Sequence, residues 1–125
     1  MQESSWRERI NTLFGTPEPP MADKETMSQY LSYLRSRIEH PCFLILAQEE
    51  SACFEALLLV DFEEEIDEEE GILAKVLRSS DGKEFRLPLV QLDCCRESSP
   101  NSQLLDDFGR WFMHTLLRRM NVEGI

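Results

Sequence analysis

The sequence predicts an α+β fold, with a small twisted antiparallel sheet or partly closed barrel of four to five strands, flanked by N-terminal helices and one C-terminal helix. Three observations lead to this prediction. Apolar residues recur at helical spacing near both ends of the chain. Short apolar runs of strand length fill the middle. Between two of these runs, Asp81-Gly82 is a residue pair that favours a tight β-hairpin turn.

Charge is concentrated in one short segment of an otherwise nearly neutral chain. The protein has 125 residues, of which 42% are hydrophobic and 30% are charged, as in a soluble globular domain. Residues 61–70, DFEEEIDEEE, contain eight carboxylates, and the formal net charge is −11. The other sixteen acids and thirteen bases leave only −3. Eight like charges repel one another, and we expect a multivalent cation or a basic partner to neutralise them.

The first helix is predicted directly after Ser5, where SWRE matches a capping box. Four residues at helical spacing form its apolar face, namely Trp6, Ile10, Leu13 and Phe14. Gly15 ends the helix, and residues 16–20, TPEPP, form a stiff connector. Because so short a helix is unstable alone in water, its apolar face either packs back on the domain or fills a groove on a partner or a second copy. Residues 1–22 are thus an N-terminal arm, and 23–120 the α+β domain.

The second helix is predicted over residues 23–39, and the strands follow it. Its apolar face consists of Met27, Tyr30, Leu31, Leu34 and Ile38, and His40-Pro41 ends it because the residue before a proline disfavours helical dihedrals. The continuous apolar run 42–47 predicts a strand that is buried on both faces or lies at the sheet centre. After a QEES turn, further strands are predicted at 52–62, 71–78 and 83–87, and residues 89–92 form an edge strand or a short helical turn.

The last helix is predicted to follow the loop Ser98-Ser99-Pro100-Asn101. Its broad apolar face consists of Leu104, Leu105, Phe108, Trp111, Phe112, Thr115 and Leu116. Asp106 and Asp107 are placed in its first turn, where carboxylates are favoured by the helix dipole. We interpret them as surface residues, with the alternative that one of them reaches a metal held by the acidic segment.

Several classes of function lack support in the sequence. His40 and His114 have no Ser or Cys near them in a nucleophile motif, and HExxH, P-loop and GxGxxG patterns are missing, so we expect no enzymatic activity. A basic nucleic-acid footprint, a membrane-spanning run and a signal-peptide layout are missing as well. The four cysteines, Cys42, Cys53, Cys94 and Cys95, show no metal-ligand spacing. They predict reduced thiols and a cytoplasmic protein.

The acidic segment 61–70 is open to three interpretations on residue chemistry alone. It is a solvated loop, a docking surface for a basic protein, or a divalent-cation site. Calcium takes six to eight hard oxygen ligands, which clustered carboxylates on a flexible loop can supply. An EF-hand is excluded, because counting from Asp61 puts Ile66 where glycine is required and Ile72 where the bidentate glutamate belongs.

The order of motifs from about Tyr30 to Leu116 resembles a family of small bacterial calcium-binding proteins typified by the acidic calcium-binding protein of cyanobacteria. The resemblance rests on a helix leading into an apolar strand, a strand that begins with glycine, a proline-leucine segment, a Ser-Pro-Asn loop and an aromatic helix. In this chain these are Tyr33 to Phe43, Gly71 to Val76, Phe85 to Leu92, Ser99-Pro100-Asn101, and Leu105 to Phe112. All of them are scaffold motifs. The resemblance implies a metal site in the acidic segment before the glycine.

We therefore predict a cytoplasmic, non-enzymatic protein that buffers or senses Ca²⁺. The predicted ligands are the eight carboxylates of the acidic segment, Asp61, Glu63, Glu64, Glu65, Asp67, Glu68, Glu69 and Glu70. The alternative is an adaptor whose acidic segment and N-terminal helix dock a partner with a basic surface, through Trp6, Ile10, Leu13 and Phe14.

Overall fold

The computed structural model describes residues 5–46, 56–95 and 99–124. Within these ranges the chain forms three α-helices, one 3₁₀ turn and five strands. In chain order they are α1 (Trp6–Phe14), α2 (Lys24–Arg37), β1 (Phe43–Leu46), β2 (Leu57–Phe62), β3 (Leu73–Arg78), β4 (Glu84–Pro88), the 3₁₀ turn η1 (Leu89–Gln91), β5 (Leu92–Cys94) and α3 (Pro100–Gly124). The α+β class and the C-terminal helix are as predicted.

The strands form one open antiparallel sheet in the order β4-β3-β2-β1-β5. Of the two predicted arrangements, the sheet is therefore the one adopted. Pro88 ends the edge strand β4, where a missing N–H costs no ladder hydrogen bond. The predicted hairpin joins β3 to β4, with Gly82 at φ 70°. Hydrogen bonds from the Arg78 side chain and the Lys83 amide lower the pKa of Asp81 in this turn to about 2.

Of the two alternatives predicted for β1, burial on both faces is wrong, because the strand lies inside the sheet between β2 and β5 and is buried on one face. Leu44 is fully buried, whereas the neighbouring Phe43 is 45% exposed. The strand lies between β2 and β5, so its ladder is paired on both sides while one sheet face stays open. The predicted QEES turn and residues 52–55 of the predicted second strand lie outside the described residues.

A β-bulge in β2 decides which side chains point inward before the acidic segment. Leu59 pairs with Val76 and Asp61 with Lys75, so the register shifts between Leu59 and Asp61. The extra residue reverses the alternation of the strand. As a result Leu59 and Phe62 are both buried although they are three residues apart, and Asp61 is exposed.

The Ser5 cap and the Gly15 end of α1 form as predicted, and α2 begins at a cap that was not predicted from the sequence. The Ser5 hydroxyl accepts a hydrogen bond from the Glu8 amide at 3.3 Å, and Gly15 ends α1 in the left-handed region at φ 66°. Helix α2 has a reciprocal capping box between Asp23 and Thr26. Both helices therefore begin at signals that are local in the sequence.

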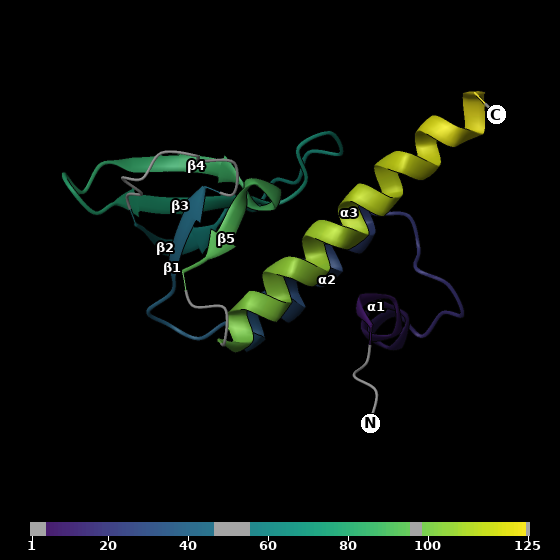
Figure 1. Cartoon of the computed structure of the whole chain (residues 1–125), viewed down its shortest axis with the longest axis horizontal. Helices are drawn as coiled ribbons and strands as arrows, with labels where there is room; N and C mark the ends of the chain where they lie inside the picture. The colour runs from purple at the N-terminus through teal and green to yellow at the C-terminus, as the bar shows by residue number, and fades with distance from the viewer. Residues whose placement is uncertain (1–4, 47–55, 96–98, 125) are drawn as a thin grey trace.

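Helix α3 is the element against which the others pack. Figure 1 shows it between the sheet on one side and α1 on the other, with α2 behind it. Its inward face buries Phe108, Trp111 and Phe112 almost completely, in one cluster with residues of α1, α2 and the sheet. None of the helices in the described part of the chain is long and apolar enough to cross a bilayer.

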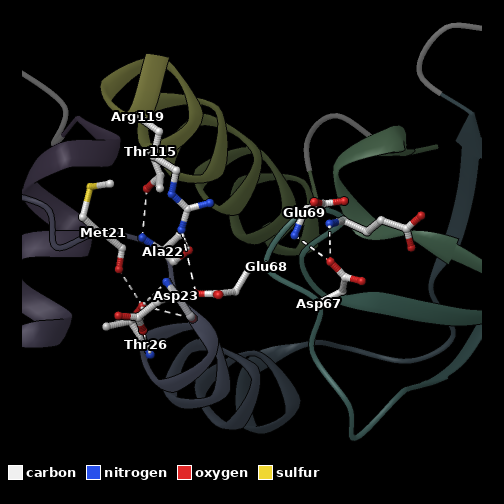
Figure 2. A network of polar contacts seen from close by, with 10 residues as sticks. Met21, Ala22, Asp23, Thr26, Asp67, Glu68, Glu69, Thr115 and Arg119 are labelled. Carbon is white, nitrogen blue, oxygen red and sulfur yellow. Dashed lines mark hydrogen bonds and ion pairs between the residues drawn. The ribbon is translucent and has the colours of Figure 1, made fainter. Parts of the chain in front are cut away.

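The N-terminal arm is fixed to α3 by polar contacts along the connector. The Trp111 indole donates to the Pro20 carbonyl at 2.7 Å, and the Ala22 amide donates to the Thr115 hydroxyl at 2.9 Å. Figure 2 shows the second contact beside Arg119, whose guanidinium donates to the Ala22 carbonyl at 3.4 Å. The arm and the α+β domain consequently share one hydrophobic cluster, which contains Ile10 of α1.

Gly71 seats the end of the acidic segment directly on α3. Its backbone lies at φ 79°, and a Cβ atom there would be 3.1 Å from Phe112 and 3.3 Å from Phe108. Both the dihedral and the lack of space require glycine. This contact accounts for the pairing of a glycine-started strand with an aromatic helix in the sequence.

The two glycines with positive φ in the sheet turns give a matched stability test. We expect Gly71→Ala to lower the free energy of unfolding by about 2–4 kcal/mol, because it adds a clash with Phe112 to the backbone strain. Gly82→Ala has similar strain and no atom within 4 Å of the new Cβ, so it should cost about 1 kcal/mol. Urea unfolding of both variants measures the difference. Equal losses would show that the seat on α3 is not tight.

Candidate functional site

The acidic segment 61–70 is partly strand and partly tight turn, which corrects the prediction of a flexible loop. Asp61 belongs to β2, and the Glu63 amide extends the ladder by donating to the Leu73 carbonyl at 2.9 Å. Asp67 and Gly71 close a turn through two backbone hydrogen bonds, of 2.6 and 3.3 Å. Ile66 packs against the hydrophobic cluster. The backbone of this acidic segment is therefore held at both ends.

Asp67 stabilises the turn from within. One of its carboxylate oxygens accepts hydrogen bonds from the amides of Glu69 and Glu70, at 2.6 and 3.2 Å. Figure 2 shows the Asp67 carboxylate directed back at these amides. Residues 67–70 thus form a short turn of four consecutive acids whose backbone conformation is set by the first of them.

Arg35 of α2 neutralises the start of the acidic segment. Its guanidinium lies 3.4 Å from the Asp61 carboxylate and 3.0 Å from that of Glu64, and it donates to the Phe62 carbonyl at 3.0 Å. These contacts connect β2 and the residues after it to the solvent-facing side of α2.

Two more arginines take one carboxylate each from the same segment. Arg86 of β4 is hydrogen-bonded to Glu63, and Arg119 of α3 lies 4.0 Å from Glu68. Together with Arg35 they neutralise four of the eight carboxylates from three different elements. From the sequence we expected a cation or a basic partner to neutralise the acidic segment. Arginines of the chain itself supply part of the neutralising charge.

Four carboxylates of the segment have no ion pair among the described residues, namely Glu65, Asp67, Glu69 and Glu70. Glu65, Glu69 and Glu70 are exposed, and no arginine or lysine of the described ranges lies within 4 Å of them. They lie on both sides of Asp67, whose second oxygen is not used by the turn. The segment is thus divided into a paired half and a free half.

The predicted calcium ligands do not form a ready cage. Calcium requires six to eight oxygens at about 2.3–2.6 Å, contributed by side chains, carbonyls or water. In the described residues no three of the acidic, histidine or cysteine side chains converge closely enough to hold an ion. A site in this segment would need Glu65, Asp67, Glu69 and Glu70 to turn toward one another over a fixed backbone, with water completing the shell.

Asp107 is a buried structural residue, which corrects its assignment to the helix surface. Because α3 begins at Pro100, Asp106 and Asp107 lie in its second turn rather than its first. Asp107 is 4% exposed and accepts two hydrogen bonds from the Arg9 guanidinium, at 2.7 and 2.9 Å. Asp106 stays exposed and pairs with Arg110 one turn later.

The Asp107 charge also acts on α2. The Tyr30 hydroxyl is buried and donates to the Leu104 carbonyl at 2.8 Å. Burial, reinforced by the negative charge of Asp107, raises the pKa of Tyr30 well above its usual value. Arg9 therefore neutralises a carboxylate at the point where α1, α2 and α3 meet.

The apolar face of α1 lies against α3, the first of its two predicted positions. Ile10 is buried, and Trp6, Leu13 and Phe14 are partly buried against the same cluster. The Trp6 ring meets that of His114 edge-on at 5.4 Å, and Phe14 lies 5.3 Å from Trp111. Binding of a partner through this face stays a prediction, and it requires α1 to leave α3.

The cysteines in the described ranges are free thiols. Cys42 is buried, and burial raises its pKa to about 11, helped by the nearby Cys94. Burial also raises the pKa of Cys95. Thiols of this kind are poor nucleophiles at neutral pH. Cys53 lies outside the described residues.

Sequence reasoning missed the arginines that hold the acidic segment and Asp107. Arg9 and Asp107 are 98 positions apart, so no local pattern links them. The ion pair between Arg86 and Glu63 is the one that could have been predicted from the sequence. Once 71–78 and 83–87 are predicted as a hairpin beside the preceding strand, Glu63, just past the end of β2, and Arg86 of β4 lie on the two sides of residues 71–78.

Comparisons with known proteins do not add an identification. No protein-family model matches the chain, and no curated protein or solved structure matches it either.

Neighbouring aspartates on α3 test the buried ion pair. Asp107→Asn should lower the free energy of unfolding by about 2 kcal/mol, because it removes charged hydrogen bonds to a partly buried Arg9. Asp106→Asn removes only the exposed ion pair with Arg110, one helical turn away, and should lower the free energy of unfolding by about 0.5 kcal/mol. Chemical denaturation of the two variants gives the comparison. A loss at Asp107 no larger than at Asp106 would contradict the assigned role.

Two triple variants with equal charge changes test the division of the acidic segment. E65Q/E69Q/E70Q removes three repelling charges without breaking an ion pair, so the melting temperature without calcium should rise slightly. E63Q/E64Q/E68Q removes the same charge together with partners of three arginines, and should give no rise. The melting curves are recorded in EGTA at low salt. A similar rise in both variants would mean that the arginine contacts contribute nothing.

Proposed function

We propose that this is a non-enzymatic calcium-binding protein that buffers or senses Ca²⁺ through the acidic segment. The supporting observation is that Glu65, Glu69 and Glu70 are exposed, have no ion pair among the described residues and flank Asp67 in the sequence, and that the turn of Asp67 is fixed to α3 through Gly71. The proposed ligands are these four side chains, completed by water. Asp61, Glu63, Glu64 and Glu68 raise the local negative potential.

The physical chemistry favours a hard, multivalent cation at this turn. Carboxylates at neighbouring positions repel one another, and this repulsion is relieved when they share a charge of +2. The fixed backbone lowers the ordering cost of binding, whereas the exposed side chains must still be brought together. We therefore expect an affinity in the sensor-to-weak range, with a Kd of about 10⁻⁶ to 10⁻⁴ M.

The arginine partners do not close the segment to a cation. Exposed ion pairs contribute about 0–1 kcal/mol, and the pair of Arg119 with Glu68 is long at 4.0 Å. Glu68 can therefore exchange Arg119 for a cation at little cost. By the same argument Glu64 is able to leave Arg35 and add an oxygen ligand.

The second candidate is an adaptor whose acidic segment docks a partner with a basic surface. The same free carboxylates support it, because an exposed acidic turn attracts basic proteins as well as cations. Salt distinguishes the candidates: an adaptor gives salt-sensitive binding to another chain, and no change with calcium in the isolated protein. For the compartment we propose the cytoplasm, since the free thiols of Cys42, Cys94 and Cys95 suit a reducing environment.

Calorimetric titration with CaCl₂, with MgCl₂ as the control ion, tests the proposal. We expect heat of binding with calcium, and a stabilisation of about 2.7 kcal/mol at a 100-fold excess over Kd. E65Q/E69Q/E70Q should weaken binding by about ten-fold or more, because it removes three of the four proposed ligands, and E63Q/E64Q/E68Q should weaken it less, because its carboxylates would first have to leave an arginine.

Two outcomes would contradict this account. If millimolar calcium produces no heat and leaves the melting temperature unchanged, the protein does not buffer or sense calcium. If E65Q/E69Q/E70Q binds as tightly as the natural chain, the site lies elsewhere. Far-UV circular dichroism of both variants establishes that they are folded.

A further inference from the structure

Helix α3 carries an exposed apolar stripe on the side away from the hydrophobic cluster. The stripe consists of Met113, Leu117 and Met120, whose side chains are 50%, 53% and 69% exposed. Their spacing of i, i+4 and i+7 places them in one row of about 10 Å along the helix. Trp111 and Thr115, on another face of the same stretch of helix, are buried. The stripe lies in the C-terminal half of α3, whose last turns extend past the other elements in Figure 1.

This stripe differs in kind from scattered exposed residues. Single exposed apolar side chains are common, but a continuous row with two methionines offers a deformable apolar surface of the kind used for binding helices. Nothing in the described part of the chain covers it, because α1, α2 and the sheet occupy the other faces of α3. Its length matches two turns of a second helix.

On one edge of the stripe, Arg119 lies between the apolar row and the acidic β2–β3 turn. Arg119, next to Met120, reaches Glu68 of the β2–β3 turn, and Gly71 holds this turn against Phe112 of the same helix. Figure 2 shows Glu68 facing Arg119, and Glu69 farther along the same turn beside Asp67. Glu69 and Glu70 are left without an ion pair among the described residues. The negative charge on this edge is therefore available to an approaching molecule.

The opposite edge, toward α1, is basic. The Arg7 guanidinium lies 5.1 Å from the centre of the Trp6 ring, and Arg118 donates to the Pro19 carbonyl at 3.1 Å. The His114 ring meets the Trp6 ring edge-on. Burial, together with the charges of Arg7 and Arg118, lowers the pKa of His114, so the positive charge of this edge comes from the two arginines. The two edges of the stripe thus carry opposite charges. A bound helix with basic residues along one side therefore has one favoured rotation about its own axis, with that side toward the acidic edge.

A second copy of this chain is a poor occupant. Each copy carries a formal net charge of −11 and brings its own acidic turn beside its own stripe. Association would therefore bring two strongly negative molecules together. A helix with basic residues beside its apolar face relieves the same charge, so the charge pattern selects a different chain.

We propose that Met113, Leu117 and Met120 form a docking surface for a short amphipathic helix of another protein, with its apolar row on this stripe and Lys or Arg along the edge that faces the β2–β3 turn. The surface is small, so the complex is weak and reversible, with a Kd of about 10⁻⁵ M. The anchors of this docking surface are side chains of α3, whereas its acidic edge includes Glu69 and Glu70, which are also proposed calcium ligands.

The test is fluorescence anisotropy of a labelled synthetic helix in EGTA, which removes any effect of calcium. The probe has about 14 residues, with leucines in one row and lysines along one edge, and the control peptide carries glutamate in place of each lysine. The lysine peptide should bind the natural protein, and the glutamate peptide should bind about ten-fold more weakly or not at all.

Protein variants then locate the binding surface. M113Q/L117Q/M120Q should weaken binding of the lysine peptide by about ten-fold, whereas V60T, which alters an exposed apolar residue of β2, should not. Circular dichroism and urea unfolding check that the triple variant keeps its fold. If it fails to fold, L117Q alone serves as the test variant.

Three results would overturn the proposal. The first is equal binding of the lysine and glutamate peptides, or no binding of either. The second is unchanged binding by M113Q/L117Q/M120Q, or by L117Q where that variant is used. The third is binding of the natural protein to phosphatidylcholine vesicles that is lost in the same variant, because the stripe would then be a lipid contact. Failure of calcium binding would leave this docking surface unaffected, since every measurement is made in EGTA.

Discussion

Helix α3 must bury one broad aromatic face against three elements at once, and the arrangement of the molecule follows from this constraint. Apolar packing alone would allow each element to slide along the helix, so a polar or steric contact fixes each position. Asp107 holds Arg9 of α1, the Leu104 carbonyl accepts from Tyr30 of α2, and Phe112 supports Gly71 of the sheet. At the start of α3, the Asn101 side-chain amide accepts a hydrogen bond from the Glu39 N–H and donates one to the Glu39 carbonyl, both at 2.8 Å. These contacts fix the backbone that follows α2.

The same contacts explain how a concentrated negative charge is tolerated. Arg35, Arg86 and Arg119 reach the acidic segment from α2, β4 and α3, so its paired carboxylates help to join these elements. The free carboxylates gather at the turn that Gly71 seats on α3. A ligand at this turn would therefore act on a segment that touches the central helix, through Phe112 and through Arg119. The carboxylates paired with arginine accordingly contribute to stability, and the unpaired carboxylates of the same segment form the proposed cation site.

Signals that are local in the sequence predicted their structures, and contacts between distant residues were not accessible. Ser5, Gly15 and the Asp81-Gly82 pair act within a few residues of themselves, and the apolar faces of the helices follow from their period alone. By contrast, the burial of Asp107 depends on Arg9, which lies almost a full chain length away. The bulge in β2 depends on pairing with β3. The scaffold motifs in the second half of the chain correspond to real contacts, Gly71 with Phe112 and Asn101 with Glu39, but they carry no information on which carboxylates stay free.

The central claim is that the free carboxylates around Asp67, rather than the whole acidic segment, define the cation site. The most direct test follows the backbone amide signals of ¹⁵N-labelled protein during a calcium titration. The account predicts that the largest chemical-shift changes lie in residues 65–71, with smaller ones near Phe112 and Arg119, while the amides of Asp61 and Glu63 in the paired half change little. Shifts spread evenly over 61–70, shifts centred elsewhere, or unchanged spectra at millimolar calcium would contradict it.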